Sequence, residues 1–176
     1  MSDEIIIIEG PDGAGKSTLA EFISKEKNIP IEHLTYYKDK KKMFEQFSEI
    51  HAKFSLEENP LILDRYIFSN IVYGCVFHDC NFVDGWRLWL DSLLTACSVR
   101  KKIIIIFCLP EKKSWLERFE KLCQERDEMY VDVDKMSKVY DMFEMIYLMI
   151  SNNTPLQILR LDPFETSKED ILKILA

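Results

Sequence analysis

Ten residues near the N-terminus, from Glu9 to Thr18, combine glycines with a lysine and a serine in the spacing of a phosphate-binding loop. They read E-G-P-D-G-A-G-K-S-T and contain the pattern G-x-x-x-x-G-K-S. Glycines let the backbone wrap a polyphosphate, and a following helix adds its positive N-terminal dipole. In this pattern Lys16 reaches the β- and γ-phosphates and the Ser17 hydroxyl holds Mg²⁺. The segment predicts ATP and Mg²⁺ binding, with contacts from Gly10, Asp12, Gly13, Ala14, Gly15, Lys16, Ser17 and Thr18.

A second group of chemically useful residues follows the apolar stretch Leu61–Leu63. It begins with Asp64-Arg65-Tyr66. A carboxylate at the end of a strand beside a P-loop strand is suited to organise Mg²⁺, so we expect Ser17 and Asp64 to form the metal site. The planar guanidinium of Arg65 is suited to clamp an anionic group. The alternative is structural: Asp64 caps the next helix and Arg65 pairs with it.

The elements that must position these residues alternate along the chain. Apolar runs predict strands at Ile5–Ile8, Glu32–Tyr36, Leu61–Leu63, Ile103–Cys108 and Leu156–Leu161. Helical periodicity predicts helices at Lys16–Lys27, Lys42–Glu57, Ser69–Phe77, Val83–Ser98, Glu111–Arg126 and Asp134–Ser151, and one that starts near Ser167 with Asp170 three residues on. This order predicts an α/β fold: one domain over residues 1–176 with a doubly wound five-stranded parallel sheet. Ligands of such sheets bind beyond the carboxyl ends of the strands.

Composition narrows the classes of partner. The net charge of −7 disfavours nucleic acid and anionic membranes as partners. The longest apolar runs are too short to span a bilayer, and the start M-S-D-E lacks a secretory pattern, so we expect a cytoplasmic protein. The five cysteines show no C-x-x-C spacing, and Cys75 and Cys108 are expected to be buried thiols. The adjacent residues His78-Asp79-Cys80 are not expected to converge on a metal ion.

Together the two motifs resemble the thymidylate kinase family. That family combines an E-G-x-D-G-A-G-K-S/T P-loop with a D-R-Y-x-x-S-x-x-A-Y segment, which here reads D-R-Y-I-F-S-N-I-V-Y. The resemblance implies a P-loop NTP hydrolase-like fold with a short lid over about residues 118–133. It also implies transfer of the γ-phosphoryl group of ATP to a deoxynucleoside monophosphate, usually dTMP. A homodimer is implied as well; its face, or part of the core, would comprise Trp86, Leu88, Trp89 and Leu93.

The resemblance also implies how an acceptor nucleotide is held. Asp12 would meet the sugar 3′-hydroxyl, and Arg65 would bind the acceptor phosphate. Ser69 and Asn70 would lie near the pyrimidine ring. Tyr73 would block a 2′-hydroxyl and thereby select deoxyribose.

The chain departs from the family pattern in its cations. Gly13 stands where some members have an arginine that touches the transferring phosphoryl group. Phosphoryl transfer still needs a cation, because positioning and electrostatics supply most of its catalysis. We expect the lid to supply it, with Arg126 as the first candidate, followed by Lys121 and Arg118.

The acceptor pocket departs from the pattern too. The family's F-P-x-R motif corresponds here to a stretch in which Tyr37 would stack on the base and Lys38 would replace the arginine. Lysine is a point charge and does not reproduce a bidentate clamp. Gly74 stands where many members have a glutamine. The pocket is therefore open to a pyrimidine other than thymine, including a modified one.

Three alternatives bear on function. A deoxynucleoside kinase shares the fold and the P-loop, but its hydroxyl acceptor needs a general base, usually a glutamate after the second strand. No glutamate occurs between Leu34 and Lys42. A GTPase would need an N-K-x-D motif, which the chain lacks. A non-catalytic nucleotide-binding protein is the third alternative.

Overall fold

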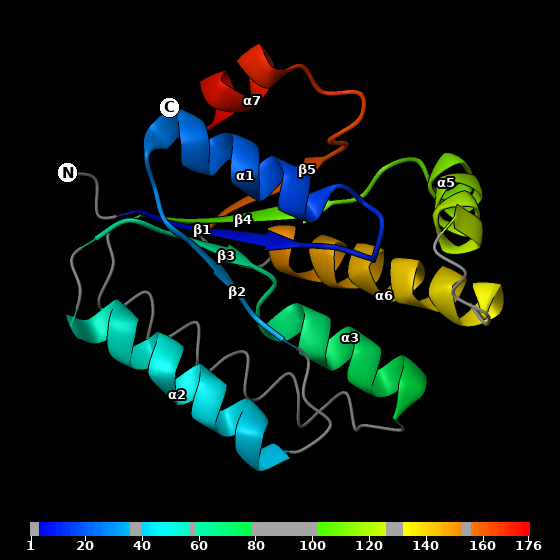
Figure 1. Cartoon of the computed structure of the whole chain (residues 1–176), viewed down its shortest axis with the longest axis horizontal. Helices are drawn as coiled ribbons and strands as arrows, with labels where there is room; N and C mark the ends of the chain where they lie inside the picture. Colours follow the sequence, from blue (N-terminus) through cyan, green and yellow to red (C-terminus); the bar gives the residue numbers. More distant parts are fainter. Residues whose placement is uncertain (1–3, 36–39, 57–58, 79–101, 126–131, 153–155) are drawn as a thin grey trace.

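A five-stranded parallel sheet forms the centre of the protein, with strand order β2-β3-β1-β4-β5 (Figure 1). Its strands are β1 (Glu4–Glu9), β2 (Ile31–His33), β3 (Leu61–Asp64), β4 (Lys102–Cys108) and β5 (Gln157–Leu161). This computed structural model describes residues 4–35, 40–56, 59–78, 102–125, 132–152 and 156–176. The predicted α/β fold with five parallel strands is confirmed.

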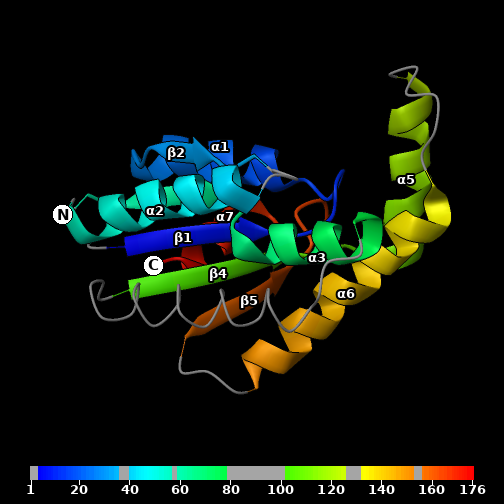
Figure 2. The ribbon, with the colours of Figure 1, turned by 90° about the horizontal axis from the view of Figure 1, so that it is seen from below.

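Helices cover both faces of the sheet (Figures 1 and 2). Their bounds are α1 (Lys16–Lys27), α2 (Lys40–Leu56), α3 (Ile67–Phe77), α5 (Lys112–Glu125), α6 (Val133–Ser151) and α7 (Lys168–Ile174). In Figure 1, α1 and α7 lie on one side of the sheet, and α2, α3 and α6 lie on the other. The predicted helix Val83–Ser98 and its proposed dimer residues lie outside the described residues.

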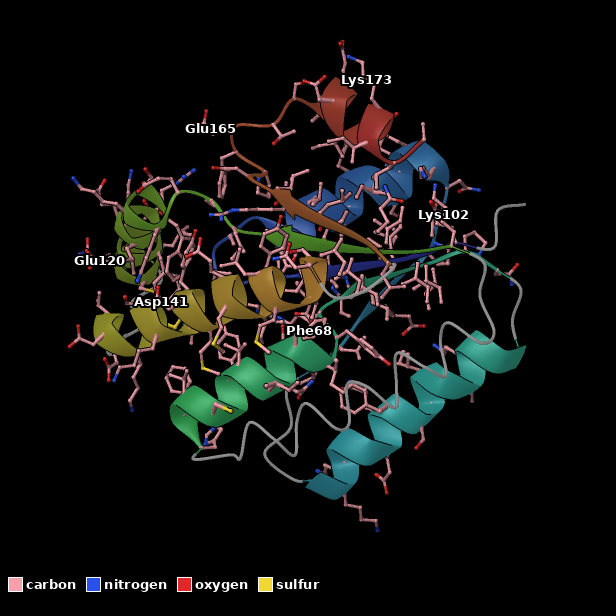
Figure 3. All side chains as sticks on the ribbon, turned by 180° about the vertical axis from the view of Figure 1, so that it is seen from behind. Phe68, Lys102, Glu120, Asp141, Glu165 and Lys173 are labelled. Carbon is pink, nitrogen blue, oxygen red and sulfur yellow. The ribbon has the colours of Figure 1, made fainter. Side chains whose placement is uncertain are left out.

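The core sits where isoleucine-rich strands meet. β1 and β4 pair in register from Glu4↔Lys102 to Glu9↔Phe107, and every residue of β1 is buried. Runs that are apolar at every position suit these strands because helices cover both of their faces. Phe68 is fully buried between α3 and the sheet, whereas labelled charged residues such as Glu120 and Lys173 lie at the periphery (Figure 3). Cys108 is buried as predicted, but Cys75 is only half-buried.

Two of the differences from the predicted element boundaries have a tertiary cause. β2 ends at His33, not at Tyr36, because its neighbour β3 ends at Asp64, the residue paired with His33. α3 begins at Ile67, not at Ser69, because the side chain of Glu9 accepts hydrogen bonds from backbone N–H groups at its start. The last helix follows the prediction, since Ser167 accepts a hydrogen bond from Asp170 N and caps α7.

Within the described part of the chain, no helix is both long and apolar enough to cross a lipid bilayer.

Candidate active site

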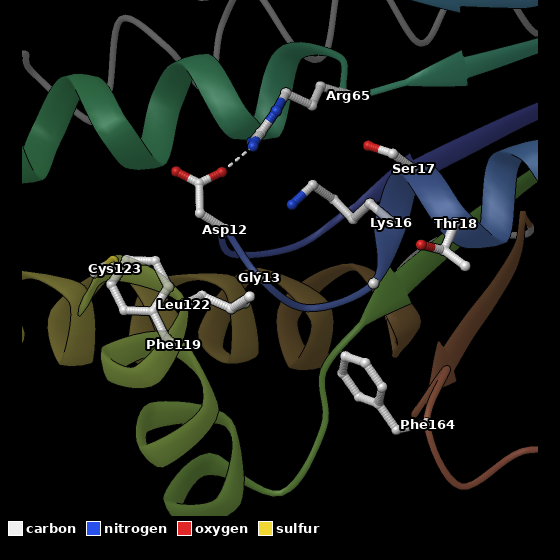
Figure 4. A pocket seen from close by; sticks show the side chains of 11 residues that line it. Asp12, Gly13, Lys16, Ser17, Thr18, Arg65, Phe119, Leu122, Cys123 and Phe164 are labelled. Carbon is white, nitrogen blue, oxygen red and sulfur yellow. Dashed lines mark hydrogen bonds and ion pairs between the residues drawn. The ribbon is translucent and has the colours of Figure 1, made fainter. Parts of the chain in front are cut away.

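The loop between β1 and α1 forms one wall of a pocket of about 580 Å³ at the carboxyl edge of the sheet (Figure 4). Loop residues 12, 13 and 15–18 line this pocket. Arg65 lines it from the end of β3, three residues of α5 line the opposite wall, and Phe164 stands after β5. The predicted phosphate loop and the second motif therefore share one pocket.

The loop passes very close to β4. A Cβ added at Gly10, whose φ is 142°, would lie 2.4 Å from the Cys108 carbonyl oxygen. Only glycine fits at this position, for both conformation and space. The chain can then turn tightly over the sheet edge and enter α1 from Gly15.

The start of α1 is left open to an anion. Among the described residues, no side chain caps this helix and its first turn holds no acidic residue. Uncapped N–H groups and the positive end of a helix dipole together form an anion site. The site's geometry thus suits a phosphate group.

Lys16 is the buried cation of this loop. It is 5% exposed, and its Nζ donates a 2.6 Å hydrogen bond to the Pro11 carbonyl oxygen. Burial, and then the positive charge of Arg65, lower the pKa of Lys16 to about 8. An anion bound between the two cations would favour the charged form of Lys16.

Ser17 and Asp64 are brought together as the sequence predicts for a metal site. Ser17 Oγ donates a 2.7 Å hydrogen bond to Asp64 Oδ2, and His33 Nδ1 lies 3.0 Å from the same oxygen. Asp64 Oδ1 is buried and has no hydrogen-bond partner among the described residues. One hydroxyl and one carboxylate fit Mg²⁺, which usually takes few protein ligands and completes its shell with water and phosphate oxygens.

Arg65 is held in place by Asp12 rather than by Asp64. Its Nη2 forms an ion pair with Asp12 Oδ1 (Figure 4), and its guanidinium lies 5.6 Å from the Tyr73 ring centre. Arg65 has φ 74°, a left-handed conformation that non-glycine residues seldom adopt. Strain of this kind is concentrated at functional sites. The structural alternative, an Asp64–Arg65 pair, does not occur.

Asp12 is ionised in this arrangement. Burial raises its pKa, but the charges of Arg65 and Lys16 outweigh that effect, so the pKa lies below the ordinary value. Its backbone N–H donates a 2.9 Å hydrogen bond to Tyr73 Oη. Asp12 therefore links the loop to Arg65 through its side chain and to α3 through its backbone.

Glu9 is a buried carboxylate whose role is not predicted by the motifs. Its Oε1 accepts hydrogen bonds from the backbone N–H groups of Tyr66 (2.9 Å), Phe68 (3.0 Å) and Ser69 (3.3 Å). The Ser69 hydroxyl donates to Oε2. Burial raises the pKa of Glu9 above its ordinary value. The residue that precedes the loop thus caps the helix that follows Arg65.

Helix α5 closes the pocket with an apolar face. Phe119 and Leu122 lie over Gly13, where an added Cβ would be 3.2 Å from Phe119 Cδ2. Arg118 stacks on Phe164 instead, with 4.0 Å between its guanidinium carbon and the ring centre. Lys121 is 76% exposed and lies 4.0 Å from Glu125. Among the described residues that line the pocket, the cations are Lys16 and Arg65.

Comparison with known proteins agrees with this architecture. No protein-family model matches the chain. It is 26% identical over 174 residues to the SPbeta prophage-derived uncharacterized protein YorR of Bacillus subtilis, covering 96% of this chain and 94% of that protein. The crystal structure of YorR in complex with phosphorylated GDP superposes with a TM-score of 0.68 at 22% identity, over 97% of this chain and 92% of that chain.

Two further solved structures share the fold at lower identity. Deoxyadenosine kinase from M. mycoides, with dCMP and dCDP bound, has a TM-score of 0.64 at 19% identity and covers 97% of this chain and 96% of that one. Polyphosphate kinase 2 from Arthrobacter aurescens has a TM-score of 0.74 at 10% identity and covers 98% of this chain and 66% of that one. The chain has the fold of the P-loop kinases.

On this P-loop kinase fold, the predicted site residues that line the pocket are Asp12, Gly13, Gly15, Lys16, Ser17, Thr18 and Arg65. Ser69 and Asn70 are buried on α3 beside Arg65, and the Asn70 Oδ1 has no hydrogen-bond partner among the described residues. Tyr37, Lys38 and Arg126 lie outside the described residues. Four further residues that the motifs do not predict reach the site through tertiary contacts: Glu9, His33, Trp115 and Phe164.

Proposed function

We propose that the protein is an ATP- and Mg²⁺-dependent kinase that phosphorylates a deoxynucleoside monophosphate, with dTMP or a related modified pyrimidine as acceptor. The observation that carries this proposal is the pairing of two cations in one pocket, Lys16 from the loop and Arg65 from the end of β3. Lys16 would bind the donor phosphates and Arg65 the acceptor phosphate. Two phosphate-bearing substrates would thus meet between them.

The donor half of the site follows from the loop. The triphosphate would lie at the open start of α1, with Mg²⁺ held by Ser17 and by Asp64 Oδ1. Mg²⁺ would neutralise charge that develops on the phosphate oxygens. The adenine ring would stack beside Phe164 and Arg118, which offer an aromatic face and a planar cation at the pocket rim.

The acceptor class is argued from acid–base chemistry. A hydroxyl acceptor needs a general base, which works best with a pKa near the operating pH. Among the described residues that line the pocket, Asp12 is the one carboxylate, and its pKa lies below the ordinary value. Glu9 has a raised pKa, but its oxygens are occupied by the start of α3. A monophosphate is already ionised and needs no base, so this site favours it.

A deoxynucleoside kinase is the second candidate. The fold shared with deoxyadenosine kinase from M. mycoides supports it about as well as it supports the first. In that case Asp12, paired with Arg65, would have to accept the proton of the sugar hydroxyl. The two candidates differ in whether the acceptor already carries a phosphate.

An acceptor panel tests the proposal. ADP formation from ATP is measured with dTMP, dUMP, 5-hydroxymethyl-dUMP, dCMP, thymidine, deoxycytidine and deoxyadenosine, and Lys16→Met serves as the inactive control. Turnover with one or more monophosphates is the expected result. Turnover with nucleosides alone would favour the second candidate. ATP binding without turnover on any acceptor would indicate a non-catalytic nucleotide-binding protein.

A further inference from the structure

Trp115 of α5 is bound to the backbone of the phosphate loop. Its indole Nε1 donates a 2.8 Å hydrogen bond to the Asp12 carbonyl oxygen, 103 residues away in sequence. The ring is fully buried and packs against Phe119 (5.7 Å between ring centres) and Tyr140 (5.3 Å). Because the ring is packed between two others, its N–H has a fixed direction.

This bond sets the orientation of the Asp12–Gly13 peptide. In a planar trans peptide, the carbonyl and the following N–H point in opposite directions. The Asp12 carbonyl points at Trp115, so the Gly13 N–H points away from it, and Gly13 lines the pocket. On the other side of the same residue, Asp12 N donates to Tyr73 Oη. The backbone of Asp12 is therefore held from α5 and from α3.

Such a restraint is needed because Gly13 has φ 73° and no Cβ. A peptide that precedes glycine can rotate between two turn conformations at little steric cost. The rotated form would present a carbonyl oxygen to the phosphate in place of an N–H. A phosphate-binding loop with that orientation would repel the ligand it has to bind.

We propose that Trp115 is a positioning residue for the triphosphate donor: its indole N–H holds the Asp12–Gly13 peptide so that the Gly13 N–H donates to a phosphate oxygen. The inference rests on the donor half of the proposed function and does not depend on the acceptor. It assigns to α5 a role in phosphate binding that requires no cation.

The test removes one hydrogen-bond donor, the indole N–H of Trp115, and keeps the aromatic ring system. Site-specific incorporation of 3-benzothienylalanine at position 115 replaces the indole N–H by sulfur at nearly unchanged shape. Trp115→Phe is the genetically simple companion. Tyr140→Phe is the matched control, because it removes a buried donor to a backbone carbonyl, that of Pro110, in the same aromatic cluster but away from the loop. Affinities for inorganic tripolyphosphate, ATP and adenosine are measured by calorimetry.

The benzothienyl variant is expected to bind tripolyphosphate and ATP about tenfold more weakly, the effect of one misdirected hydrogen bond, with adenosine binding unchanged. In steady state, the KM for ATP rises while the KM for the acceptor does not. Unchanged tripolyphosphate affinity in this variant, or an equal loss in Tyr140→Phe, would overturn the inference. Failure of the proposed function looks different: tripolyphosphate binding depends on position 115, but no monophosphate is phosphorylated.

Discussion

Ser17 Oγ donates a 2.7 Å hydrogen bond to Asp64 Oδ2 and so joins the first turn of α1 to the last residue of β3. The second carboxylate oxygen of Asp64 is buried without a partner among the described residues. Leaving a buried carboxylate oxygen unsatisfied is costly, and a bound cation would remove that cost. The pair therefore offers two ligands to a Mg²⁺ ion, whose coordination shell the phosphates and water would complete.

Replacing Asp64 by Asn is expected to abolish the contribution of Mg²⁺ to ATP binding. The amide keeps the size of the side chain but removes the charge that attracts the metal. Calorimetry of ATP with Mg²⁺ and with EDTA should give two different affinities for the wild type and one for Asp64→Asn. Circular dichroism would confirm that the variant is folded. A Mg²⁺ effect of wild-type size in the variant would exclude Asp64 as the metal residue.

The pKa of Lys16, about 8 in the free protein, predicts a pH dependence of phosphate binding. Only the protonated amine attracts phosphate, so the affinity for tripolyphosphate should fall about tenfold between pH 7 and pH 9. Binding near pH 8 should take up protons, which calorimetry in buffers of different ionisation enthalpy detects. Lys16→Met should bind weakly at both pH values and show no such dependence.

The same shift has a defined effect on stability. The pKa of Lys16 is lower in the folded state than its ordinary value of 10.5, so the unfolded chain binds more protons between about pH 8 and pH 10.5. The contribution of Lys16 to the free energy of unfolding therefore rises with pH across that window. Urea unfolding of wild type and Lys16→Met at pH 7.5 and pH 10 isolates the effect, because groups distant from Lys16 titrate alike in both proteins. A difference between the two proteins that does not change with pH would contradict the assignment.

Arg65→Lys is expected to raise the KM for the acceptor monophosphate about tenfold and to leave the KM for ATP nearly unchanged. Lysine retains the charge but not the planar fork that can hold a phosphate and Asp12 together. Arginine and lysine have the same conformational cost at the φ of 74° at position 65, so the free energy of unfolding should change little. Steady-state kinetics with each substrate varied in turn distinguish this from an equal rise in both KM values, which would indicate a general disturbance of the pocket.

Glu9→Ala is expected to destabilise the protein by about 3 kcal/mol, because it leaves the first N–H groups of α3 without a buried acceptor. Glu9→Gln keeps one carbonyl oxygen and should cost less. Urea denaturation measures both variants. Glu45→Ala, on the exposed face of α2, is the control and should stay within about 0.5 kcal/mol of wild type.

Steady-state kinetics can distinguish the roles of two lid cations, Arg126 and Arg118. If Arg126 contacts the transferring phosphoryl group, Arg126→Ala lowers kcat by about a thousandfold with little effect on acceptor affinity. Arg118 stacks on Phe164, so Arg118→Ala should raise the KM for ATP instead. An unchanged kcat in Arg126→Ala would show that another residue supplies the charge.

The sequence predicts the elements well wherever local pattern decides them. β1 and β4 are found because each contains an uninterrupted apolar run, Ile5–Ile8 and Ile103–Cys108, and α1 has the predicted bounds, Lys16–Lys27. β2 was predicted too long because its end depends on where β3 ends. A strand boundary set by a neighbouring strand leaves no local signal.

The site residues divide in the same way, into those that a local motif predicts and those that only tertiary packing brings to the site. The phosphate loop is contiguous, so spacing alone predicts it, and the position of Asp64 at a strand end predicts its approach to Ser17. Glu9 and Trp115 act across 57 and 103 residues of sequence, through packing that no short motif encodes. Glu9 lies inside the P-loop motif, yet its function as a helix cap becomes visible only once α3 is placed beside β1.

The contact between Gly13 and Phe119 also bears on how this site can evolve. The Cβ of any side chain at position 13 would lie 3.2 Å from Phe119 Cδ2. The backbone there has φ 73°, a conformation that residues with a Cβ seldom adopt. An arginine at position 13 would therefore require Phe119 to shift away from the loop. Glycine at this position allows α5 to pack directly on the phosphate loop, and an arginine there would be gained at the expense of that packing.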